Sequence, residues 1–435
     1  MVAPLRIALA GLGTVGAGVI RLVEANADLI ARRAGRPIVV TVVGARDRNK
    51  DRGVDLSPYA WEDDMVIMGE RDDVDVVVEL VGGSDGPALS CARTTIEAGK
   101  ALVTANKAMI AHHGLELAAK AEAAKVALKF EAAVAGGIPV IKALREGAAA
   151  NAIERVYGIL NGTCNYILST MEDTGRGFAE VLSEAQAKGY AEADPAFDVE
   201  GTDAAHKLSI LAAIAFGSKL DFSAVETSGI TRLTAADIAQ ADALGYVIRL
   251  IGMADTEALN GTQKLFQRVQ PHLVPFDHPL AHVDGATNAV VAEGNFSGRL
   301  LFQGAGAGEG PTASAVVADL IDIARGEVGT PFSVPVAELE EMPPAGAGQR
   351  RGRAYIRFMV ADRPGALAEI TAAMRDASVS IESLIQKGRD ADSGAVMVAM
   401  VTHEGPESAV SEALRLLEGS ESLIEAPLVL HILGN

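Results

Sequence analysis

Residues 189 to 207, GYAEADPAFDVEGTDAAHK, contain residue types that bind ions and transfer protons. Five carboxylates precede one lysine, Lys207, and the segment leads into the apolar run LSILAAIAFG. The alternative is a solvated acidic loop, because Asp, Gly and Pro are common loop residues. The five carboxylates are Glu192, Asp194, Asp198, Glu200 and Asp203.

The stretch that follows these carboxylates is predicted to be a buried helix. From Gly201 to Phe216 there is no proline, and apolar residues occupy nearly every side of a 3.6-residue period. Asp203 and Lys207 lie four residues apart and therefore share one face of its first two turns. Such a pair is usually a weak surface contact, but an ionised pair close to a core is costly. We therefore favour a polar site, because buried ionisable groups gather where chemistry occurs.

A glycine-rich turn near the N-terminus is a second candidate site. The predicted strand LRIALA (5–10) precedes GLGTVG (11–16), and one helix from Thr14 to about Ala34 is predicted to follow. G-x-G-x-x-G between a strand and a helix indicates dinucleotide binding. The first glycine permits the tight turn, the second lets backbone approach the pyrophosphate, and the third lets helix and strand pack closely. The predicted contacts are Gly11, Leu12, Gly13, Thr14, Val15 and Gly16.

The residues after the second predicted strand, IVVTVVGA (38–45), bear on the type of dinucleotide. An acidic residue there would hold the ribose of NAD, whereas arginine accommodates the 2′-phosphate of NADP. Arg46, Arg48 and Lys50 surround the single Asp47, which favours NADP, with NAD as the alternative.

Further strands are predicted at 74–83 and 101–108, with a helix over 87–98 between them. Ligands of open parallel sheets bind beyond the carboxyl ends of the strands. Gly82 and Lys107 occupy such ends, so we expect both to face the cofactor.

The composition is typical of a soluble α/β protein with two or three domains: 435 residues, 49% hydrophobic and 4% aromatic. A net charge of −19 argues against nucleic acid or an anionic membrane as partner. The start lacks the features of a signal peptide and no apolar run approaches a membrane span, so a cytoplasmic protein is predicted. Cys164 and His206 are both interpreted as packed residues without a catalytic role.

Seven motifs follow one another along the chain: GLGTVGAG at the start, TANKA (104–108), EAAVAGGIP (131–139), GILNGTCNYIL (158–168), GYAEADP (189–195), GTDAAHKL (201–208) and GAGAGEGPTAS (304–314). Together they resemble the homoserine dehydrogenase family. GILNGTCNYIL, GYAEADP and GTDAAHKL are the most specific of them. The resemblance implies NAD(P)-dependent interconversion of L-homoserine and L-aspartate 4-semialdehyde, in the biosynthesis of threonine, methionine and isoleucine.

The resemblance also implies roles for individual residues. Lys207 is expected to donate the proton to the aldehyde oxygen, and Lys107 corresponds to the family's other active-site lysine. Which lysine contributes more stays open. Glu192 and Asp203 are suited to hold the substrate ammonium, and carboxylates do this well in a desolvated cleft. The expected substrate-binding set is Gly189, Glu192, Asp198 and Asp203, and Gly306, in a segment that leads into a helix near Thr312, is expected to contact the cofactor.

One glycine-rich turn matches the family's site for a monovalent cation. Such a turn can offer several backbone carbonyls to a hard cation such as sodium, although a Gly-Gly turn also forms without an ion. The matching residues are Glu131, Val134, Gly136 and Ile138.

The last eighty or so residues read as a separate unit with elements in the order βαββαβ, which is typical of a ferredoxin-like module. DRPGALAEI (362–370) resembles an ACT regulatory domain, which implies feedback by threonine; a dimerisation element without effector is the alternative. The chain is thus predicted to be α/β, with a Rossmann NAD(P)-binding domain (1–135), an α+β catalytic and dimerisation domain (136–335), a linker (336–352) and an ACT-like domain (353–435).

Two other classes of protein compete with this interpretation. A 2-hydroxyacid dehydrogenase with an ACT tail would usually rely on a histidine with a carboxylate partner, whereas the candidate site here combines lysine with carboxylates. A non-catalytic sensor built from Rossmann and ACT folds would not need Lys107 and Lys207. A homodimer and a homotetramer are both compatible with the sequence.

Overall fold

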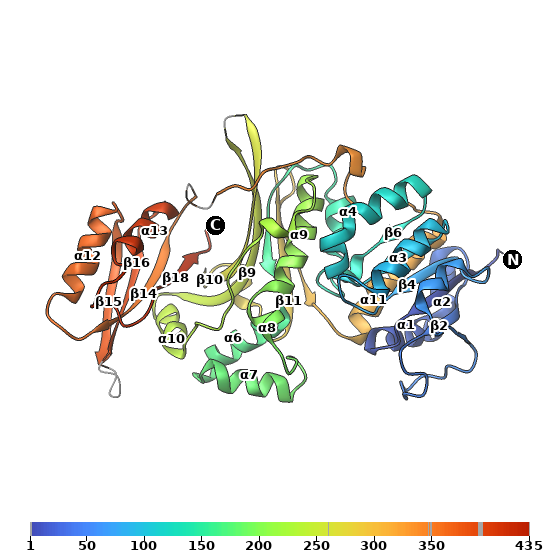
Figure 1. Cartoon of the computed structure of the whole chain (residues 1–435), viewed down its shortest axis with the longest axis horizontal. Helices are drawn as coiled ribbons and strands as arrows, with labels where there is room; N and C mark the ends of the chain where they lie inside the picture. The colour runs from blue at the N-terminus through green and yellow to red at the C-terminus, as the bar shows by residue number, and fades with distance from the viewer. Residues whose placement is uncertain (1, 260, 347, 349, 390–394, 435) are drawn as a thin grey trace.

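The computed structural model describes residues 2–259, 261–346, 348, 350–389 and 395–434. Three parts follow one another along the long axis in Figure 1: the N-terminal part in blue, a central part in green and yellow, and the C-terminal part in orange and red. Among the described residues, every helix is too short or too polar to traverse a lipid bilayer.

The N-terminal part is a parallel sheet of six strands in the order β3-β2-β1-β4-β5-β6. Strands that leave β1 in both directions make a switch point, and a ligand crevice forms there at the carboxyl ends of the strands. The Rossmann prediction is therefore confirmed. The strands are β1 (Leu5–Ala10), β2 (Ile38–Gly44), β3 (Ala60–Trp61), β4 (Val76–Glu79), β5 (Ala101–Thr104) and β6 (Leu128–Lys129).

The helices of this part correct two sequence predictions. The single helix predicted over 14–34 is wrong, because Asn26, with φ −115° and ψ 23°, breaks it into two. The side chain of Asn competes for backbone hydrogen bonds and so favours helix ends. The strand predicted over 101–108 ends at Thr104, and Lys107 begins a helix. The helices are α1 (Thr14–Ala25), α2 (Ala27–Ala34), α3 (Pro87–Glu97) and α4 (Lys107–Ala124).

A helix from late in the sequence, α11 (Glu309–Arg325), returns to pack on α1. Val316 and Leu320 of α11 are buried in one core with Val19 and Ile20 of α1. The helix begins at Glu309 rather than near Thr312 as predicted. The two helices approach closely at Gly18, where an added Cβ would lie only 2.6 Å from Cγ of Glu309.

The central part is one half of a mixed sheet in the order β12-β11-β7-β9-β10-β18-β14-β16-β15, with helices on one face. Its strands are β7 (Ile153–Ile159), β8 (Glu226–Thr227), β9 (Tyr246–Leu259), β10 (Thr262–Pro275), β11 (Thr287–Gly294) and β12 (Gly298–Ala305). Its helices are α5 (Val140–Lys142), α6 (Gly162–Thr174), α7 (Phe178–Ala187), α8 (Ala196–Val199), α9 (Thr202–Phe216) and α10 (Ala235–Ala243).

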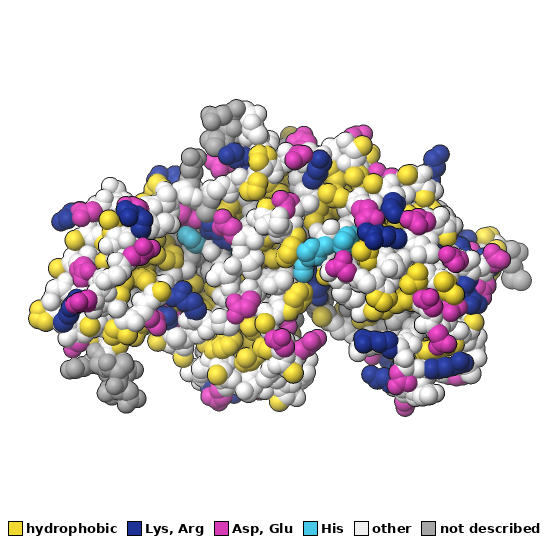
Figure 2. All heavy atoms as spheres, viewed as in Figure 1, with side chains coloured by type: hydrophobic (Ala, Val, Ile, Leu, Met, Phe, Trp, Pro, Cys, Tyr) yellow, Lys and Arg dark blue, Asp and Glu magenta, His cyan; other side chains and the backbone are white. Residues whose placement is uncertain are grey.

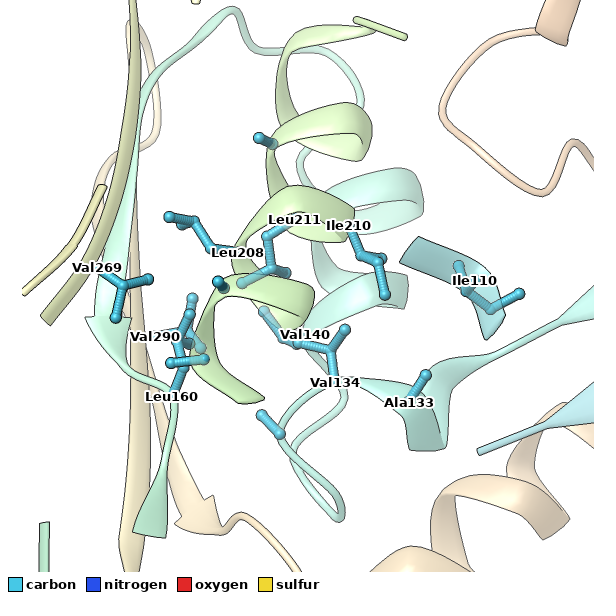
Figure 3. Packing of buried hydrophobic residues seen from close by; sticks show 14 of the residues in the cluster. Ile110, Ala133, Val134, Val140, Leu160, Leu208, Ile210, Leu211, Val269 and Val290 are labelled. Atoms are coloured by element: carbon cyan, nitrogen blue, oxygen red, sulfur yellow. The ribbon is translucent and has the colours of Figure 1, made fainter. Parts of the chain in front are cut away.

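Helix α9 is buried on all sides, as its apolar sequence predicts. Figure 3 shows Leu208 and Leu211 on the side of the sheet residues Val269 and Val290, while Ile210 points toward Ile110 of α4. The helix thus lies between the central sheet and the N-terminal part. Burial on this scale fixes the orientation of the polar residues in its first two turns.

The C-terminal part has the predicted βαββαβ order, and its four strands pair as β18-β14-β16-β15. Strand β18 also pairs in parallel with β10, so the sheets of the central and C-terminal parts are continuous. Short strands β13 (Arg351–Gly352) and β17 (Gly405–Pro406) pair beside this junction. The elements of the module are β14 (Ala354–Ala361), α12 (Ala366–Asp376), β15 (Ile381–Arg389), β16 (Ala395–Thr402), α13 (Glu407–Leu416) and β18 (Leu428–Ile432).

The predicted linker lies along the central sheet. Its 3₁₀ turn at Val336–Glu338 is followed by a bond from the Ala345 N–H to the Leu265 carbonyl at 2.8 Å. Ala347 and Gln349 of this segment lie outside the described residues.

Candidate active site

The carboxylate of Asp203 lies between the two candidate lysines. Lys207 Nζ is 2.6 Å from Asp203 Oδ2, and Lys107 Nζ is 2.8 Å from Oδ1. The spacing of Asp203 and Lys207 on α9 predicted the first contact. The second joins α9 to the start of α4, and no local spacing along the chain predicts it.

Asn161 anchors this carboxylate from the central sheet. Its Nδ2 donates to Asp203 Oδ2 at 2.8 Å and to Asp198 Oδ1 at 2.7 Å. Its Oδ1 accepts the N–H of Cys164 at 2.8 Å and so caps α6. The preceding residue, Leu160, offers its carbonyl to Lys207 Nζ at 2.8 Å. Asn161 was not predicted as a site residue, although it lies within GILNGTCNYIL and an Asn before a helix is a signal for a cap.

The position of Lys107 is fixed by the ends of β4 and β5. Buried Glu79 accepts the hydroxyl of Thr104 at 2.6 Å and the N–H of Val81 at 2.7 Å. Asn106 caps α4 through Met109 N–H and donates to the Gly83 carbonyl at 2.7 Å. Lys107 is therefore the first residue of a helix whose start is bound to the crevice edge of the sheet.

The two lysines have pKa values that move in opposite directions. Burial lowers the pKa of Lys207, and Asp203 offsets this only in part. Burial also opposes the charge of Lys107, but Asp203, Asp198 and Glu192 together raise its pKa. Although burial alone would raise the pKa of Asp203, the two ammonium groups hold it well below its usual value. The centre of the site is thus an anion between two cations.

The other carboxylates of the acidic segment differ in their surroundings. Burial raises the pKa of Asp198, despite the bond from Asn161. Glu192 is exposed, and Asp194 accepts the N–H of Ala196 two residues on. Gly189, with φ 75°, supplies the left-handed turn after α7.

Cys164 and His206 are both buried beside the site. The thiol of Cys164 contacts the Asp198 carbonyl at 3.2 Å, and burial raises its pKa far above the usual value. His206 Nε2 lies 3.3 Å from His112 Nε2, and burial together with His112 lowers the pKa of His206 to about 4. Figure 2 shows histidine side chains gathered where the central and N-terminal parts meet.

The glycine-rich turn after β1 has the close contacts that its glycines predict. Gly11 has φ 108°, and a Cβ on Gly16 would lie 2.2 Å from the Gly11 carbonyl oxygen. The exposed basic loop after β2 is fastened to this turn by Arg52, whose Nε donates to the Leu12 carbonyl at 2.8 Å. Arg52 was not predicted as a site residue, although it continues the Arg46, Arg48, Lys50 series by one further cation.

The GAGAGEGPTAS segment packs against the Gly-Gly turn after β6. The N–H of Gly137 donates to the Ala305 carbonyl at 3.2 Å, and a Cβ on Gly136 would lie 2.4 Å from the Gly306 oxygen. Glu309 forms an ion pair with Arg21 of α1. The segment therefore lies between the dinucleotide-binding part and the central part.

The carboxylate of Glu131 is hydrogen-bonded to the protein backbone. Its two oxygens accept the N–H groups of Ile141 and Lys142, each at 2.9 Å. Burial and the nearby charge of Asp319 raise the pKa of Glu131 to about 7. Among the described residues, no three or more His, Cys, Asp or Glu side chains are grouped to hold a metal. Backbone carbonyls are therefore the ligands that this turn could offer a cation.

A Rossmann sheet with a glycine-rich turn, next to a lysine and carboxylate site on a second domain, defines the class of nicotinamide-dependent dehydrogenases. Comparison with known families narrows this class. The homoserine dehydrogenase NAD-binding domain matches residues 11–131, the homoserine dehydrogenase domain matches 139–321, and the ACT domain matches 354–418.

Known homoserine dehydrogenases are similar to this chain over nearly its full length. Homoserine dehydrogenase of Pseudomonas aeruginosa is 45% identical over 433 residues, which cover 98% of each chain, and that of Neisseria gonorrhoeae is 44% identical with the same coverage. The crystal structure of a homoserine dehydrogenase from Thiobacillus denitrificans has a TM-score of 0.92 at 42% identity, over 99% of this chain and 98% of that one. The chain belongs to the homoserine dehydrogenase family, whose members are oxidoreductases acting on a CH–OH group.

Proposed function

We propose that this enzyme interconverts L-homoserine and L-aspartate 4-semialdehyde, with Lys207 as proton donor and acceptor. The observation that carries the proposal is the carboxylate of Asp203 between Nζ of Lys107 and Nζ of Lys207. The substrate has an ammonium and a carboxylate at one end and the reacting alcohol or aldehyde at the other. A site that contains both lysines and carboxylates can bind both charged groups of this substrate.

Lys207 is the better proton donor of the two lysines because burial lowers its pKa. A lysine with a lowered pKa releases its proton more readily to the oxygen that becomes the alcohol, and accepts it again in the reverse direction. Its Nζ is held by Asp203 and by the Leu160 carbonyl, which fixes the direction of transfer. The nicotinamide cofactor, when bound, supplies or accepts the hydride.

Lys107 is proposed to stabilise negative charge on the reacting oxygen. Its raised pKa keeps it an ammonium, and its side chain is one-third exposed, at the edge of the crevice. Among the carboxylates, Asp203 already accepts both lysines and Asn161, so exposed Glu192 is the freer ligand for the substrate ammonium. Asp198 would support the same end of the substrate, with Gly189 shaping the loop.

We further propose NADP as the preferred cofactor. Arg46, Arg48 and Lys50 are exposed after β2, where a 2′-phosphate would lie, and Arg48 lies 5.5 Å from the Trp61 ring centre. The pyrophosphate is proposed to contact the turn of Gly11 to Gly16, with Gly82 and Gly306 on either side. A hyperthermophilic archaeal homoserine dehydrogenase that shares this fold was solved in complex with NADPH, at 24% identity.

The turn from Glu131 to Ile138 is proposed to bind sodium or a similar monovalent cation through backbone carbonyls. Ala135 and Gly136 are consecutive left-handed residues, with φ 55° and 54°, and form a tight loop. Buried Glu131 lies beside Asp319, which itself pairs with Lys142 at 3.5 Å. Activity measured in sodium chloride and in choline chloride at equal ionic strength tests this; equal rates would count against the cation.

The C-terminal module is proposed to respond to threonine, in an enzyme of threonine, methionine and isoleucine biosynthesis that assembles as a homodimer or homotetramer. Its support is the match to the ACT domain. The expected domain borders remain our proposal: 1–135, 136–335, 336–352 and 353–435. Helix α11 lies within the second range but packs on the first domain.

The reaction is tested by the loss of nicotinamide absorbance with purified protein, L-aspartate 4-semialdehyde and NADPH or NADH, with and without threonine. Rapid oxidation supports the proposal and ranks the cofactors. A protein that binds NADPH but oxidises neither cofactor would contradict it, and 2-oxo acids would then be the next substrates to assay.

A further inference from the structure

A cavity of about 330 Å³ lies where the central sheet meets the C-terminal module. Strands β9 and β10 form one wall, and residues 350–353, β18 and the chain end form the other. Five arginines from both sides line it: Arg155, Arg268, Arg350, Arg351 and Arg353. The reaction proposed above uses none of them.

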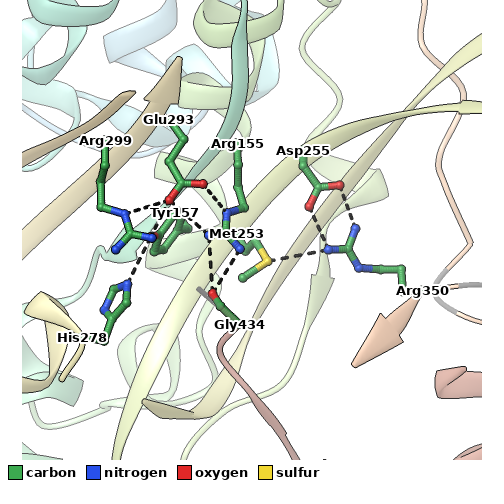
Figure 4. Close-up of polar contacts among 9 residues, drawn as sticks. All are labelled: Arg155, Tyr157, Met253, Asp255, His278, Glu293, Arg299, Arg350 and Gly434. Atoms are coloured by element: carbon green, nitrogen blue, oxygen red, sulfur yellow. Dashed lines mark hydrogen bonds and ion pairs between the residues drawn. The ribbon is translucent and has the colours of Figure 1, made fainter. Parts of the chain in front are cut away.

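Arg350 and Arg155 are held in place by ion pairs with Asp255 and Glu293, two carboxylates outside the lining of the cavity. Arg350 binds Asp255 through two bonds of 2.7 and 2.8 Å, and its guanidinium lies 3.7 Å from the Phe266 ring centre. Arg155 pairs with Glu293 at 3.0 Å and bonds the Gly434 carbonyl near the chain end. Figure 4 shows Arg350 with Asp255, and Arg155 with Glu293 and Gly434. The guanidinium groups are therefore oriented before any ligand binds, which lowers the entropic cost of binding.

Two carboxylates line the same cavity, Glu404 and Glu407. Glu407 accepts Arg268 at 2.9 Å. Glu404 lies 3.5 Å from Arg351, and both side chains are more than half exposed, so this is the loosest charge pair of the cavity. A ligand with a carboxylate and an ammonium can replace one weak pair by two ion pairs. A simple anion can satisfy only the arginine side.

The two histidines of the cavity contribute polarity without charge. Burial, with Arg268 and Arg350 nearby, lowers the pKa of His272 to about 3 and that of His431 to about 4. His431 Nδ1 is 3.7 Å from Glu407. At neutral pH the charge in the cavity therefore comes from the arginines and glutamates alone.

A smaller hollow of about 180 Å³ shares Arg351, Glu404 and Glu407 with this cavity. It adds small and apolar groups such as Val379 and Val410, together with the hydroxyl of Thr402. The charged groups therefore stand beside room for a short side chain.

We propose that this junction binds a free L-α-amino acid with a short side chain. Its carboxylate is placed against Arg350 and Arg351, and its ammonium against Glu404 and Glu407. Because β18 pairs with β10 and Arg268 of β10 binds Glu407 of α13, an occupant contacts both the module and the central sheet. The inference rests on the proposed effector role of the C-terminal module and gives that effector a location.

The test is isothermal titration of the full-length protein, without nicotinamide cofactor, with threonine, serine, alanine, valine, inorganic phosphate and propylamine. The variants are Arg351→Gln and Glu404→Gln. Their matched controls are Arg415→Gln and Glu412→Gln, which remove the same charges from an exposed pair on α13. We expect an L-amino acid to bind the wild type, and each cavity variant to weaken binding by about tenfold or more, because each loses a charge-assisted bond. The controls should bind as the wild type does.

The outcomes separate this inference from the proposed function. Uninhibited turnover of semialdehyde and NADPH should be unchanged in all four variants, and it reports on the reaction alone. Binding of serine or alanine but not threonine supports the cavity and removes threonine as effector. Equal amino-acid binding by wild type and both cavity variants overturns the location. Binding of phosphate alone, or of no compound, overturns an amino-acid site.

Discussion

Lys107 and Lys207, on α4 and α9, contact opposite oxygens of the Asp203 carboxylate, at 2.8 and 2.6 Å. Helix α4 belongs to the part with the dinucleotide turn, and α9 belongs to the central part. The contact therefore forms the site at the boundary between two domains. The two lysines also differ in their pKa values, because the pKa of Lys207 is lowered while that of Lys107 is raised.

Replacing Lys207 by methionine should lower kcat by about 10²–10⁴, the usual contribution of a general acid. Methionine keeps the length and fills the apolar surroundings, so the fold should persist. Cofactor affinity, measured by NADPH fluorescence, should stay unchanged. Lys219→Met, at an exposed pair with Glu341, is the control and should keep full activity. Turnover within threefold of wild type would remove Lys207 from its role.

Replacing Asn161 should separate its two functions. Asn161→Ala loses the cap of α6 and the bonds to Asp198 and Asp203, so we expect a loss of about 1 kcal/mol or more in stability, and lower kcat. Asn161→Ser can still accept the Cys164 N–H and should recover much of the stability but little of the activity. Urea denaturation and steady-state kinetics measure the two effects. If serine restores both, Asn161 acts only as a cap.

Replacing Arg46 and Arg48 together by glutamine should weaken NADPH binding by about tenfold or more and change NADH binding little, because only NADPH carries a 2′-phosphate. The control is Arg375→Gln with Arg415→Gln, two exposed arginines of the C-terminal part. Binding titrations with both nucleotides give the answer. Equal losses for the two would show that these arginines do not read the phosphate.

The stability of the enzyme should fall as pH is lowered from about 6.5 to 4, partly through His206. The folded pKa of His206 is about 4 and its ordinary value is 6.5, so the unfolded chain binds the extra proton in this window. The contribution of His206 is present above pH 6.5 and is worth up to about 3 kcal/mol. His206→Gln should therefore show a shallower decline in unfolding free energy between pH 7 and 5.

His282, which is exposed, provides the control for this pH series. His282→Gln should retain the wild-type slope of stability against pH. A wild-type slope in His206→Gln as well would mean that the other histidines with lowered pKa values, His272, His278 and His431, account for the decline.

Local sequence patterns predicted helices and strands well where the apolar periodicity and the turn residues indicated the same element. The apolar period from Gly201 to Phe216 predicted α9, and the glycine-rich turn predicted the Rossmann sheet, which the structure confirms. The helix break at Asn26 is a local feature, because an Asn side chain favours helix ends. The end of β5 before Lys107, by contrast, is accompanied by the bond from Asn106 to the Gly83 carbonyl, which is distant in sequence.

The sequence by itself determined the residue types of the site, the spacing of Asp203 and Lys207 on one helix face, and the family. These are local properties, because an i, i+4 pair meets on any helix. Only the tertiary structure decided that Lys107 shares Asp203, that Asn161 anchors it, and that five arginines surround a cavity at the junction with the C-terminal module. Such contacts join segments far apart along the chain, and packing in three dimensions, not periodicity, selects them.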